Sequence, residues 1–323
     1  MPSYAFFKNN MVPIEEAKVS VMTHAFNYGT GVFEGIRAYW NDDQQQLYVF
    51  QLAAHYARFL NSCKALMISL PYSVDDLCQI TLDLLRREGY KANTYIRPLA
   101  YKSSEGIGVR LHDLEADFTV FALPFGKYIE KDECAKVAVS SWRRVDDNAI
   151  PARAKIVGAY VNSALAKTEA ALNGYDEAIV LTQDGHVSEG SAENFWMVKN
   201  GKAITPPVSD NILEGITRQV VREFLQNELG VEVVERTIDR TELYQADEAF
   251  FCGTGVEIVG IGEIDRRPVG IGRAGPITRR IRQLYFDAVS GRLPKYLSWC
   301  TPVYPEQRAT MPRIERKVKV TGK

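Results

Sequence analysis

Apolar residues recur at helical spacing in three parts of the chain. In the segment SVDDLCQITLDLLRREG, from Ser73 to Gly89, the side chains of Leu77, Ile80 and Leu84 share one face of a helix. Ser73 is a suitable N-cap, and Gly89 stands where the helix should end. The same spacing, again closed by a glycine, occurs in residues 160–174 and 215–230. The pattern therefore predicts a helix in each of the three segments.

Shorter apolar runs between these segments are rich in β-branched and aromatic residues and predict strands. Two of them are TYIRPLAYK (94–102) and DFTVFALPF (117–125). A third, EAIVLT (177–182), is separated from HVSEGSAENFWMV (186–198) by a turn at Asp184 and Gly185, which predicts a hairpin. After about Ser290 the chain is rich in proline and basic residues without clear periodicity, so we expect a loosely ordered tail there.

A polar, charged stretch, FGKYIEKDECAK (125–136), divides the apolar pattern into two halves. With 323 residues the chain also exceeds the size at which a single core usually stops growing. We therefore expect a small N-terminal α/β domain, an interdomain loop, a larger domain and a C-terminal tail. The predicted bounds are residues 1–125, 126–136, 137–300 and 301–323.

Composition narrows the function classes. The chain is 46% hydrophobic and 24% charged with a net charge of −1, which is typical of a globular protein and offers no basic field for nucleic acid. No apolar run is long enough to span a membrane, and no signal peptide precedes the first strands. The five cysteines are scattered and contain no metal-binding pair. We expect a cytoplasmic protein that binds small molecules, without a metal ion, nucleic acid or membrane partner.

Two glycine-containing junctions are candidate anion sites. Gly215, Ile216 and Thr217 begin a predicted helix, whose free N–H groups attract phosphate. The sequence Cys252-Gly253-Thr254-Gly255 follows the apolar run EAFF and offers a similar turn. For each junction, ordinary turn or cap glycines remain an alternative. No Walker A or G-x-G-x-x-G motif is present, so a nucleotide is not indicated.

Lys155, in RAKIVGAY, is followed at once by apolar residues. A lysine held among apolar groups loses its proton more easily and can form a Schiff base with an aldehyde. The residues alone leave open that Lys155 is an exposed helix-start lysine, that Glu189 is a turn carboxylate, and that Arg58 and Arg97 lie on the surface. His24 has no partner suggesting catalysis and is interpreted as structural. Spacing alone thus names no reaction.

Taken together, six motifs resemble the branched-chain aminotransferases of the pyridoxal-phosphate fold type IV group. They occur in the family's order, and the resemblance extends from about Tyr4 to about Gly291. The motifs are HAFNYGTGVFEGIR (24–37), YIRPL (95–99), AKIVGAY (154–160), SEGSAEN (188–194), LEGITR (213–218) and CGTGVEI (252–258). One such string would carry little weight, but six in order are highly specific. The resemblance implies an α+β or α/β fold with a smaller N-terminal α/β domain and a larger, mixed, barrel-like cofactor-binding domain.

The resemblance implies pyridoxal 5′-phosphate as cofactor and assigns roles to residues of this chain. Lys155 matches the catalytic lysine that holds the cofactor as a Schiff base and moves the substrate proton. Glu189 matches the carboxylate beside the pyridine nitrogen, and Tyr160 the tyrosine that binds the phenolic oxygen. The remaining cofactor residues implied are Arg58, Leu213, Gly215, Ile216, Thr217 and Thr254, most of them around the phosphate.

Substrate residues follow from the same resemblance. Tyr95 and the Thr254-Gly255 turn match the α-carboxylate site, whereas Arg97 matches the group that receives the distal carboxylate of glutamate. An apolar wall is implied at Tyr28, Phe33, Gly35, Phe125 and Tyr128, with Val109 matching a residue contributed by a neighbouring subunit. Phe125, Ile156-Val157 and Gly255-Val256 depart from residues common in the family. These departures leave open the preference among leucine, isoleucine, valine and aromatic substrates.

The implied reaction is reversible, ping-pong transfer of the amino group of L-leucine, L-isoleucine or L-valine to 2-oxoglutarate. The resemblance also implies a homo-oligomer, either a dimer or a hexamer. Alternatives that share the lysine and glutamate are D-amino-acid aminotransferases, R-selective amine transaminases and aminodeoxychorismate lyases. The pairing of YIRPL with FEGIR favours the branched-chain group over these. A non-enzymatic binding module is a further alternative, against which the intact set Lys155, Glu189, Tyr160 and Arg58 argues.

Overall fold

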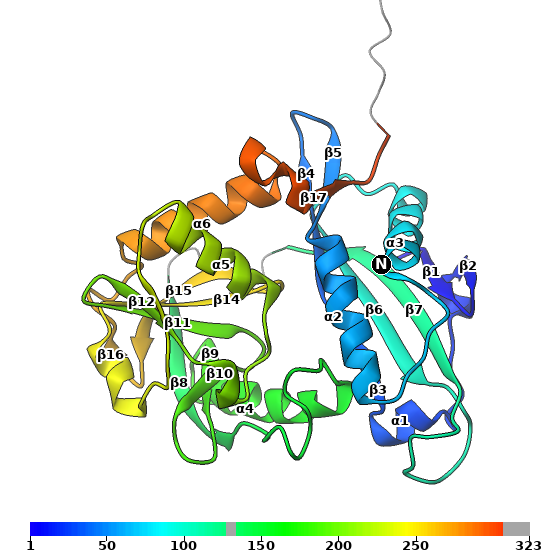
Figure 1. Ribbon diagram of the computed structural model, residues 1–323, viewed down its shortest axis with the longest axis horizontal. Coiled ribbons are helices and arrows are strands. Elements are labelled where there is room, and N and C mark those ends of the chain that lie inside the picture. Colours follow the sequence, from blue (N-terminus) through cyan, green and yellow to red (C-terminus); the bar gives the residue numbers. More distant parts are fainter. Residues whose placement is uncertain (127–133, 306–323) are drawn as a thin grey trace, which may run out of the picture.

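The computed structural model describes residues 1–126 and 134–305, and two large sheets dominate it (Figure 1). The first is an 8-stranded antiparallel sheet in the order β17-β5-β4-β6-β7-β1-β2, with β3 paired to β6. Its strands are β1 (Tyr4–Phe7), β2 (Asn10–Pro13), β3 (Gly31–Phe33), β4 (Ile36–Asn41), β5 (Gln46–Phe50), β6 (Thr94–Lys102), β7 (Ala116–Pro124) and β17 (Cys300–Pro302). The helical elements beside it are η1 (Ile14–Glu16), α1 (His24–Tyr28), α2 (Leu52–Ala65) and α3 (Val74–Glu88).

The first sheet and its helices share one apolar core. Tyr56 and Phe59 of α2 and Leu77 and Leu84 of α3 are fully buried. They belong to the same cluster as Ile36, Leu47, Val49, Ile96 and Val120 from the strands. The apolar helical face that the sequence predicts in α3 is therefore the face that the core holds. This packing makes the first sheet a firm support for whatever its strands present on their other side.

The second sheet is 9-stranded and mixed, in the order β10-β9-β8-β15-β14-β11-β12-β13 with β16 on β15. Its strands are β8 (Ala135–Arg143), β9 (Glu177–Leu181), β10 (Val187–Gly190), β11 (Asn194–Lys199), β12 (Lys202–Thr205), β13 (Val233–Glu235), β14 (Glu248–Gly253), β15 (Glu257–Ile264) and β16 (Arg267–Pro268). The strand β8 runs parallel to β9 and β15, and β12 runs parallel to β13. Its helical elements are η2 (Val157–Ala159), α4 (Tyr160–Leu172), η3 (Val208–Asp210), α5 (Ile216–Asn227), η4 (Arg240–Gln245), α6 (Pro276–Val289) and η5 (Pro294–Trp299).

The three predicted helices are confirmed as α3, α4 and α5. The glycines expected to close them, Gly89, Gly174 and Gly230, all adopt positive φ angles, of 67°, 79° and 62°. Such left-handed positions favour glycine because a Cβ would be strained there. The mixed α and β content that the sequence predicts is also confirmed. None of the helices among the described residues combines the length and apolar character needed to cross a membrane.

The predicted hairpin is present, but its second arm is divided. The strand β9 pairs with β10, and the chain then turns at residues 191–193 before β11 pairs with β14 and β12. The turn is closed by a hydrogen bond from the Gly190 N–H to the Glu193 carbonyl oxygen. A side chain at Gly190 would come within 2.9 Å of Glu193 and 3.0 Å of Phe251. The break at this glycine brings the ends of both strands to the same place in the sheet.

The loosely ordered tail expected from about Ser290 is wrong for the described residues. After α6 the chain forms η5, and Cys300–Pro302 then pairs with β5 of the first sheet. Tyr296 and Trp299 pack on Phe224, and Trp299 also contacts the ring of Phe50. Proline and basic residues hid these aromatic anchors from periodicity. Residues 306–323, and most of the expected connection 126–136, lie outside the described residues, and β8 begins at Ala135.

The first turn of α3 provides a test of local stability. The Ser73 side chain accepts a hydrogen bond from the Asp76 N–H, and the Asp76 carboxylate accepts from the Ser73 N–H, which forms a capping box. Replacing Ser73 by alanine leaves the Asp76 amide without this partner, so we expect the free energy of unfolding to fall by about 1 kcal/mol. Denaturant titration measures this difference. Ser73→Thr, which keeps the hydroxyl, should lose much less, and equal losses in the two variants would contradict the capping role.

Candidate active site

A cavity of about 650 Å³ lies between the two sheets, a volume typical of small-molecule sites. Both halves of the chain line it. The first sheet and α2 contribute Phe33, Gly35, Arg58, Tyr95, Arg97, Leu99 and Phe125. The second half contributes, among others, Arg144, Lys155, Tyr160, Lys167, Glu189, Asn194, Leu213, Gly215, Ile216, Thr217, Thr254, Gly255 and Val256. A single cavity thus gathers residues from all six of the sequence motifs.

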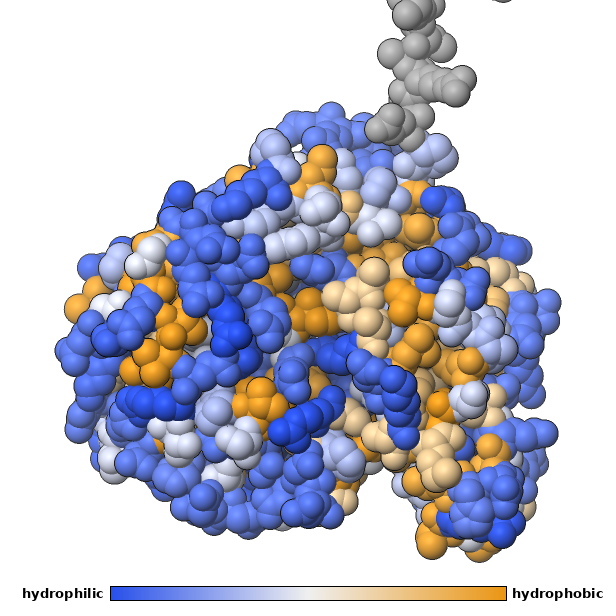
Figure 2. Space-filling view, in the orientation of Figure 1, coloured by the Kyte–Doolittle hydropathy of each residue, from blue (hydrophilic) through white to orange (hydrophobic). Residues whose placement is uncertain are grey.

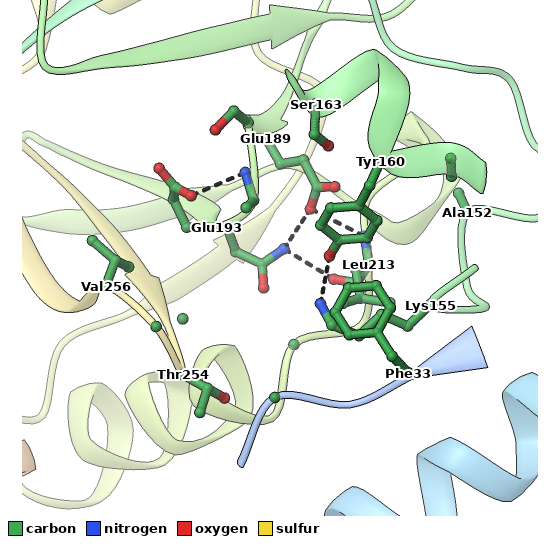
Figure 3. A pocket seen from close by; sticks show the side chains of 18 of the residues that line it. Phe33, Ala152, Lys155, Tyr160, Ser163, Glu189, Glu193, Leu213, Thr254 and Val256 are labelled. Atoms are coloured by element: carbon green, nitrogen blue, oxygen red, sulfur yellow. Dashed lines mark hydrogen bonds between the residues drawn. The ribbon is translucent and has the colours of Figure 1, made fainter. Parts of the chain in front are cut away.

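Lys155 reaches into this cavity from the segment before η2. Its backbone is fixed on both sides, because its carbonyl oxygen accepts from the Phe33 N–H and its N–H donates to the Ser62 hydroxyl. Its Nζ donates to the Tyr160 hydroxyl oxygen at 2.5 Å and lies 4.9 Å from the centre of the Phe33 ring (Figure 3). An amine held between an aromatic face and a hydroxyl, and open to a cavity, is placed to attack an electrophile.

Glu189 faces the same cavity and is almost fully buried, with 4% of its surface exposed. Its Oε1 accepts from Arg144 at 2.8 Å, and its Oε2 accepts from the Asn194 side-chain amide at 3.0 Å and the Leu213 N–H at 3.1 Å (Figure 3). Burial raises the pKa of Glu189, while the Arg144 charge, the Leu213 hydrogen bond and the Lys155 charge oppose that rise. The carboxyl group is therefore fixed in orientation and suited to pairing with a protonated ring nitrogen.

Two sets of backbone N–H groups border the cavity without a hydrogen-bond partner among the described residues. One set is the first turn of α5, at Ile216, Thr217 and Arg218, and the other is the turn at 254–256. Gly215 begins the first of these, where an added Cβ would collide with Asn194 Oδ1. A helix N-terminus and a turn with free amides both favour bound anions. The cavity therefore has two separate places to hold a phosphate or a carboxylate.

Arg58 is held at the cavity edge by Glu34, a buried carboxylate of the FEGIR motif. The Arg58 Nε and Nη2 donate to the two Glu34 oxygens at 2.7 and 2.8 Å, and the His55 ring shares Oε2 at 2.8 Å. Although burial opposes it, the charge of Arg58 and the hydrogen bonds from His55 and Arg58 hold the pKa of Glu34 well below its usual range. The Nη1 of Arg58 donates to the Glu214 carbonyl oxygen beside the α5 N-terminus. The guanidinium thus adds positive charge next to free amides.

The opposite end of the cavity is aromatic with one cation. Tyr95 and Phe125 have ring centres 5.3 Å apart, and the Tyr95 hydroxyl accepts from Arg97 at 2.7 Å. Arg97 lies over the Phe33 ring at 4.5 Å, and its Nε is buried without a hydrogen-bond partner among the described atoms. A side chain at Gly35 would come within 2.5 Å of the Tyr95 hydroxyl. Both apolar groups and an additional anion can therefore be accommodated here.

Most of the residues that the sequence suggests are brought together, but three are not among those lining the cavity. Tyr28 lies apart from it and accepts a hydrogen bond from the Gly108 N–H, and Val109 is 78% exposed. Tyr128 is outside the described residues. Sequence reasoning missed Glu34, Arg144 and Asn194. The first and last lie inside quoted motifs, whereas nothing in the sequence around Arg144 marks it.

Comparison with known proteins agrees with the motifs. Residues 31–264 match the model of the family "Amino-transferase class IV". A probable branched-chain-amino-acid aminotransferase of Aquifex aeolicus is 50% identical over 301 residues, covering 93% of this chain and 97% of that protein. The chain belongs to the class IV aminotransferases. The branched-chain-amino-acid aminotransferase of Escherichia coli K12 is 39% identical over 304 residues, covering 93% and 97% of the two chains.

Solved structures of class IV relatives share the whole architecture. The branched-chain aminotransferase of Thermoproteus uzoniensis, solved with norvaline, has a TM-score of 0.90 at 45% identity and covers 94% of this chain and all of its own. The enzyme of Thermobaculum terrenum in its PLP form has a TM-score of 0.90 at 40% identity, covering 94% and 99%. The predicted family, its two-sheet mixed fold and the assignment as a branched-chain-amino-acid aminotransferase are thereby confirmed.

Proposed function

We propose that this enzyme transfers the amino group of L-leucine, L-isoleucine or L-valine to 2-oxoglutarate and uses pyridoxal 5′-phosphate as its cofactor. One observation carries the proposal: Lys155 Nζ, Glu189 and two sets of free backbone amides face one cavity. These are an amine, a ring-nitrogen partner and an anion site, which are the three features that a phosphorylated pyridine aldehyde requires. The named relatives bind pyridoxal phosphate or its amine form, which agrees with this fit.

The residues present divide naturally over such a cofactor. Arg58 and the amides of Ile216 and Thr217, with Thr254, would hold the phosphate, and Glu189 with Asn194 and Leu213 behind it would face the ring nitrogen. Tyr160 would donate to the phenolic oxygen. When bound, the cofactor supplies an electron sink that stabilises negative charge at the substrate Cα. The orientation of Glu189 by Arg144 keeps this carboxylate facing the ring.

Lys155 has two tasks in this arrangement. Its Nζ attaches the cofactor covalently before substrate enters, and once released it takes the proton from the substrate Cα and returns it on the cofactor side. The 2.5 Å contact with the Tyr160 hydroxyl keeps Nζ close to the ring throughout. Both half-reactions use the same cavity in turn, as a ping-pong mechanism requires.

The two substrate types fit different groups of the same cavity. Phe33, Tyr95 and Phe125 offer apolar surface for a branched side chain, worth about 1.5–3 kcal/mol when fully buried. Glutamate and 2-oxoglutarate carry a distal carboxylate, which the unpartnered Nε of Arg97 can receive. The free amides of the 254–256 turn, with Tyr95, would hold the α-carboxylate common to both. Neither substrate then needs a separate site.

Replacing Arg97 by alanine tests this division. We expect kcat/KM for glutamate and 2-oxoglutarate to fall about 10- to 100-fold, because a charge-assisted hydrogen bond to the distal carboxylate is lost. The value for leucine should change much less, apart from the lost contact between Arg97 and the Phe33 ring. Steady-state kinetics with each substrate measures the split. An equal loss for leucine and glutamate would argue against the assigned role.

A panel of amino donors decides among the remaining members of the fold. With 2-oxoglutarate as acceptor, L-leucine, L-isoleucine and L-valine should react, and D-leucine, D-alanine and R-amines should not. Aminodeoxychorismate incubated without any keto acid should release no pyruvate. Reaction of D-alanine or of an R-amine in preference to L-leucine would replace the branched-chain proposal by one of these alternatives, and pyruvate release would replace it by a lyase.

An exposed apolar region supports the proposed homo-oligomer. Figure 2 shows apolar surface on the projection at the lower right, where Figure 1 places α1 and the connection from β6 to β7. Phe26 is 69% exposed and Ile107 is 80% exposed, next to the exposed Val109. Such patches mark protein interfaces. Sedimentation or light scattering should therefore give the mass of at least a dimer, and a monomer at micromolar concentration would contradict this part of the proposal. The free cysteines fit a reducing, cytoplasmic setting.

A further inference from the structure

Arg37, at the end of the FEGIR motif, is buried outside the cavity and makes contact with both halves of the chain. Only 2% of its surface is exposed. From β4 of the first sheet, its Nη1 pairs with Glu257 at 2.9 Å and donates to the Gly255 carbonyl oxygen at 3.3 Å. Its Nη2 donates to the carbonyl oxygens of Phe125, at 3.1 Å, and Gly126. One guanidinium thus holds both the turn and the aromatic wall of the cavity.

The bond to Gly255 fixes the orientation of a peptide plane. Because the peptide bond is trans, the Val256 N–H points away from a carbonyl that faces Arg37. Arg37 does not line the cavity, whereas Thr254, Gly255 and Val256 do. The carbonyl is therefore drawn to the outer side of the turn and the free N–H is presented to the cavity. A cation on the carbonyl also polarises the peptide and strengthens its N–H as a donor.

Glu257 shows that this arrangement is maintained against a local cost. Its φ is +61°, a left-handed conformation that strains a residue with a Cβ, and its side chain is almost fully buried against Arg37. Arg37 also lies over the rings of Phe125, at 5.0 Å, and Tyr39, at 5.7 Å. The ion pair and the rings leave the guanidinium little freedom to turn. The position of the 254–256 turn relative to Phe125 is thus set by a rigid group.

We infer that Arg37, with Glu257, is a positioning residue that orients the 254–256 turn to receive the substrate α-carboxylate. This inference rests on the proposed function, in which that turn holds the carboxylate common to amino-acid and keto-acid substrates. It predicts that Arg37 governs the affinity for carboxylates without touching substrate. The attachment of the cofactor through Lys155 does not depend on Arg37.

Two probes that differ only in the substrate groups they retain separate positioning from general damage. One is 4-methylvaleric acid, which keeps the leucine side chain and carboxylate but lacks the amino group. The other is 3-methylbutylamine, which keeps the side chain and amine but lacks the carboxylate. In the cofactor-loaded enzyme, Arg37→Gln should raise the inhibition constant of the acid and the KM for leucine roughly 10- to 100-fold. The rate at which the amine bleaches the visible absorption of the bound cofactor should be unchanged.

Three further variants complete the test. Arg37→Lys keeps the charge but cannot span the contacts, so it should show a smaller split of the same sign. Glu257→Gln should do likewise, and it serves if Arg37→Gln does not fold. Arg236→Gln is the matched control, because Arg236 also pairs with a glutamate, Glu242, and a carbonyl oxygen, Thr237 O, away from the cavity. It should alter neither probe.

The outcomes that overturn the inference are distinct from those that overturn the proposed function. Equal losses for the acid and the amine, or no loss for either, would remove the positioning role of Arg37. A loss of cofactor affinity without a change for the acid would show that the turn holds the phosphate instead. A wild-type enzyme that loads cofactor but does not convert L-leucine would refute the proposed function itself.

Discussion

Replacing Lys155 by alanine is expected to lower kcat for L-leucine and 2-oxoglutarate by at least about 10⁴-fold. Its Nζ is the amine that lies against both Tyr160 and Phe33 in the cavity, so its loss removes the covalent anchor and the proton carrier together. The variant should also lack the visible absorption that a lysine-bound cofactor gives. Coupled assays of glutamate formation and absorption spectra measure the two effects.

The matched variant is Lys167→Ala, because Lys167 also lines the cavity. Its Nζ pairs with the buried Glu177 at 2.5 Å, so its removal should lower stability but keep the visible absorption of the loaded enzyme. If Lys155→Ala kept the absorption and transaminated leucine while Lys167→Ala lost both, the proposed anchor would be the wrong lysine.

Replacing Glu189 by glutamine is expected to lower kcat about 10²- to 10³-fold, the scale seen when one preorganised electrostatic partner is removed. The amide retains the shape of the side chain but cannot pair with a protonated ring nitrogen. Because glutamine also brings an NH₂ group towards Arg144 or Asn194, part of the network that accepts on Glu189 is lost as well.

Glu189→Asp provides the charge-retaining comparison. It should recover part of the activity, since a carboxylate remains, though at a greater distance from the cavity. Thermal unfolding of both variants shows whether the fold is intact. Glutamine and aspartate variants that lost the same activity, or a glutamine variant with wild-type kcat, would contradict the ring-pairing role.

Helices and caps were predictable because their signals are local. Ser73 and Gly89 act on neighbouring residues in the chain, and the apolar face of α3 repeats every three to four positions. The divided hairpin arm was not predictable from alternation. Its break depends on Gly190 fitting against Glu193 and Phe251, of which the second comes from β14. Strand β17 escaped prediction for a similar reason, since its pairing partner β5 lies about 250 positions earlier in the chain.

The candidate site follows the same rule. Motifs marked Lys155, Glu189 and the glycine junctions, and these residues do meet at one cavity. The groups behind them form only through tertiary contacts. Arg144 reaches Glu189 across 45 positions, and Arg37 reaches Glu257 across about 220. A spacing argument does not detect such pairs, because each partner alone resembles an ordinary surface charge.

The most direct test of the central claim is chemical trapping of the cofactor. The purified enzyme, loaded with pyridoxal 5′-phosphate, is treated with borohydride, which fixes a lysine-bound cofactor as a stable secondary amine, and its peptides are mapped by mass spectrometry. The account predicts the added pyridoxyl mass on Lys155 and its absence after prior incubation with excess L-leucine. A label on Lys167 or any other lysine in place of Lys155, or no label at all, would contradict it.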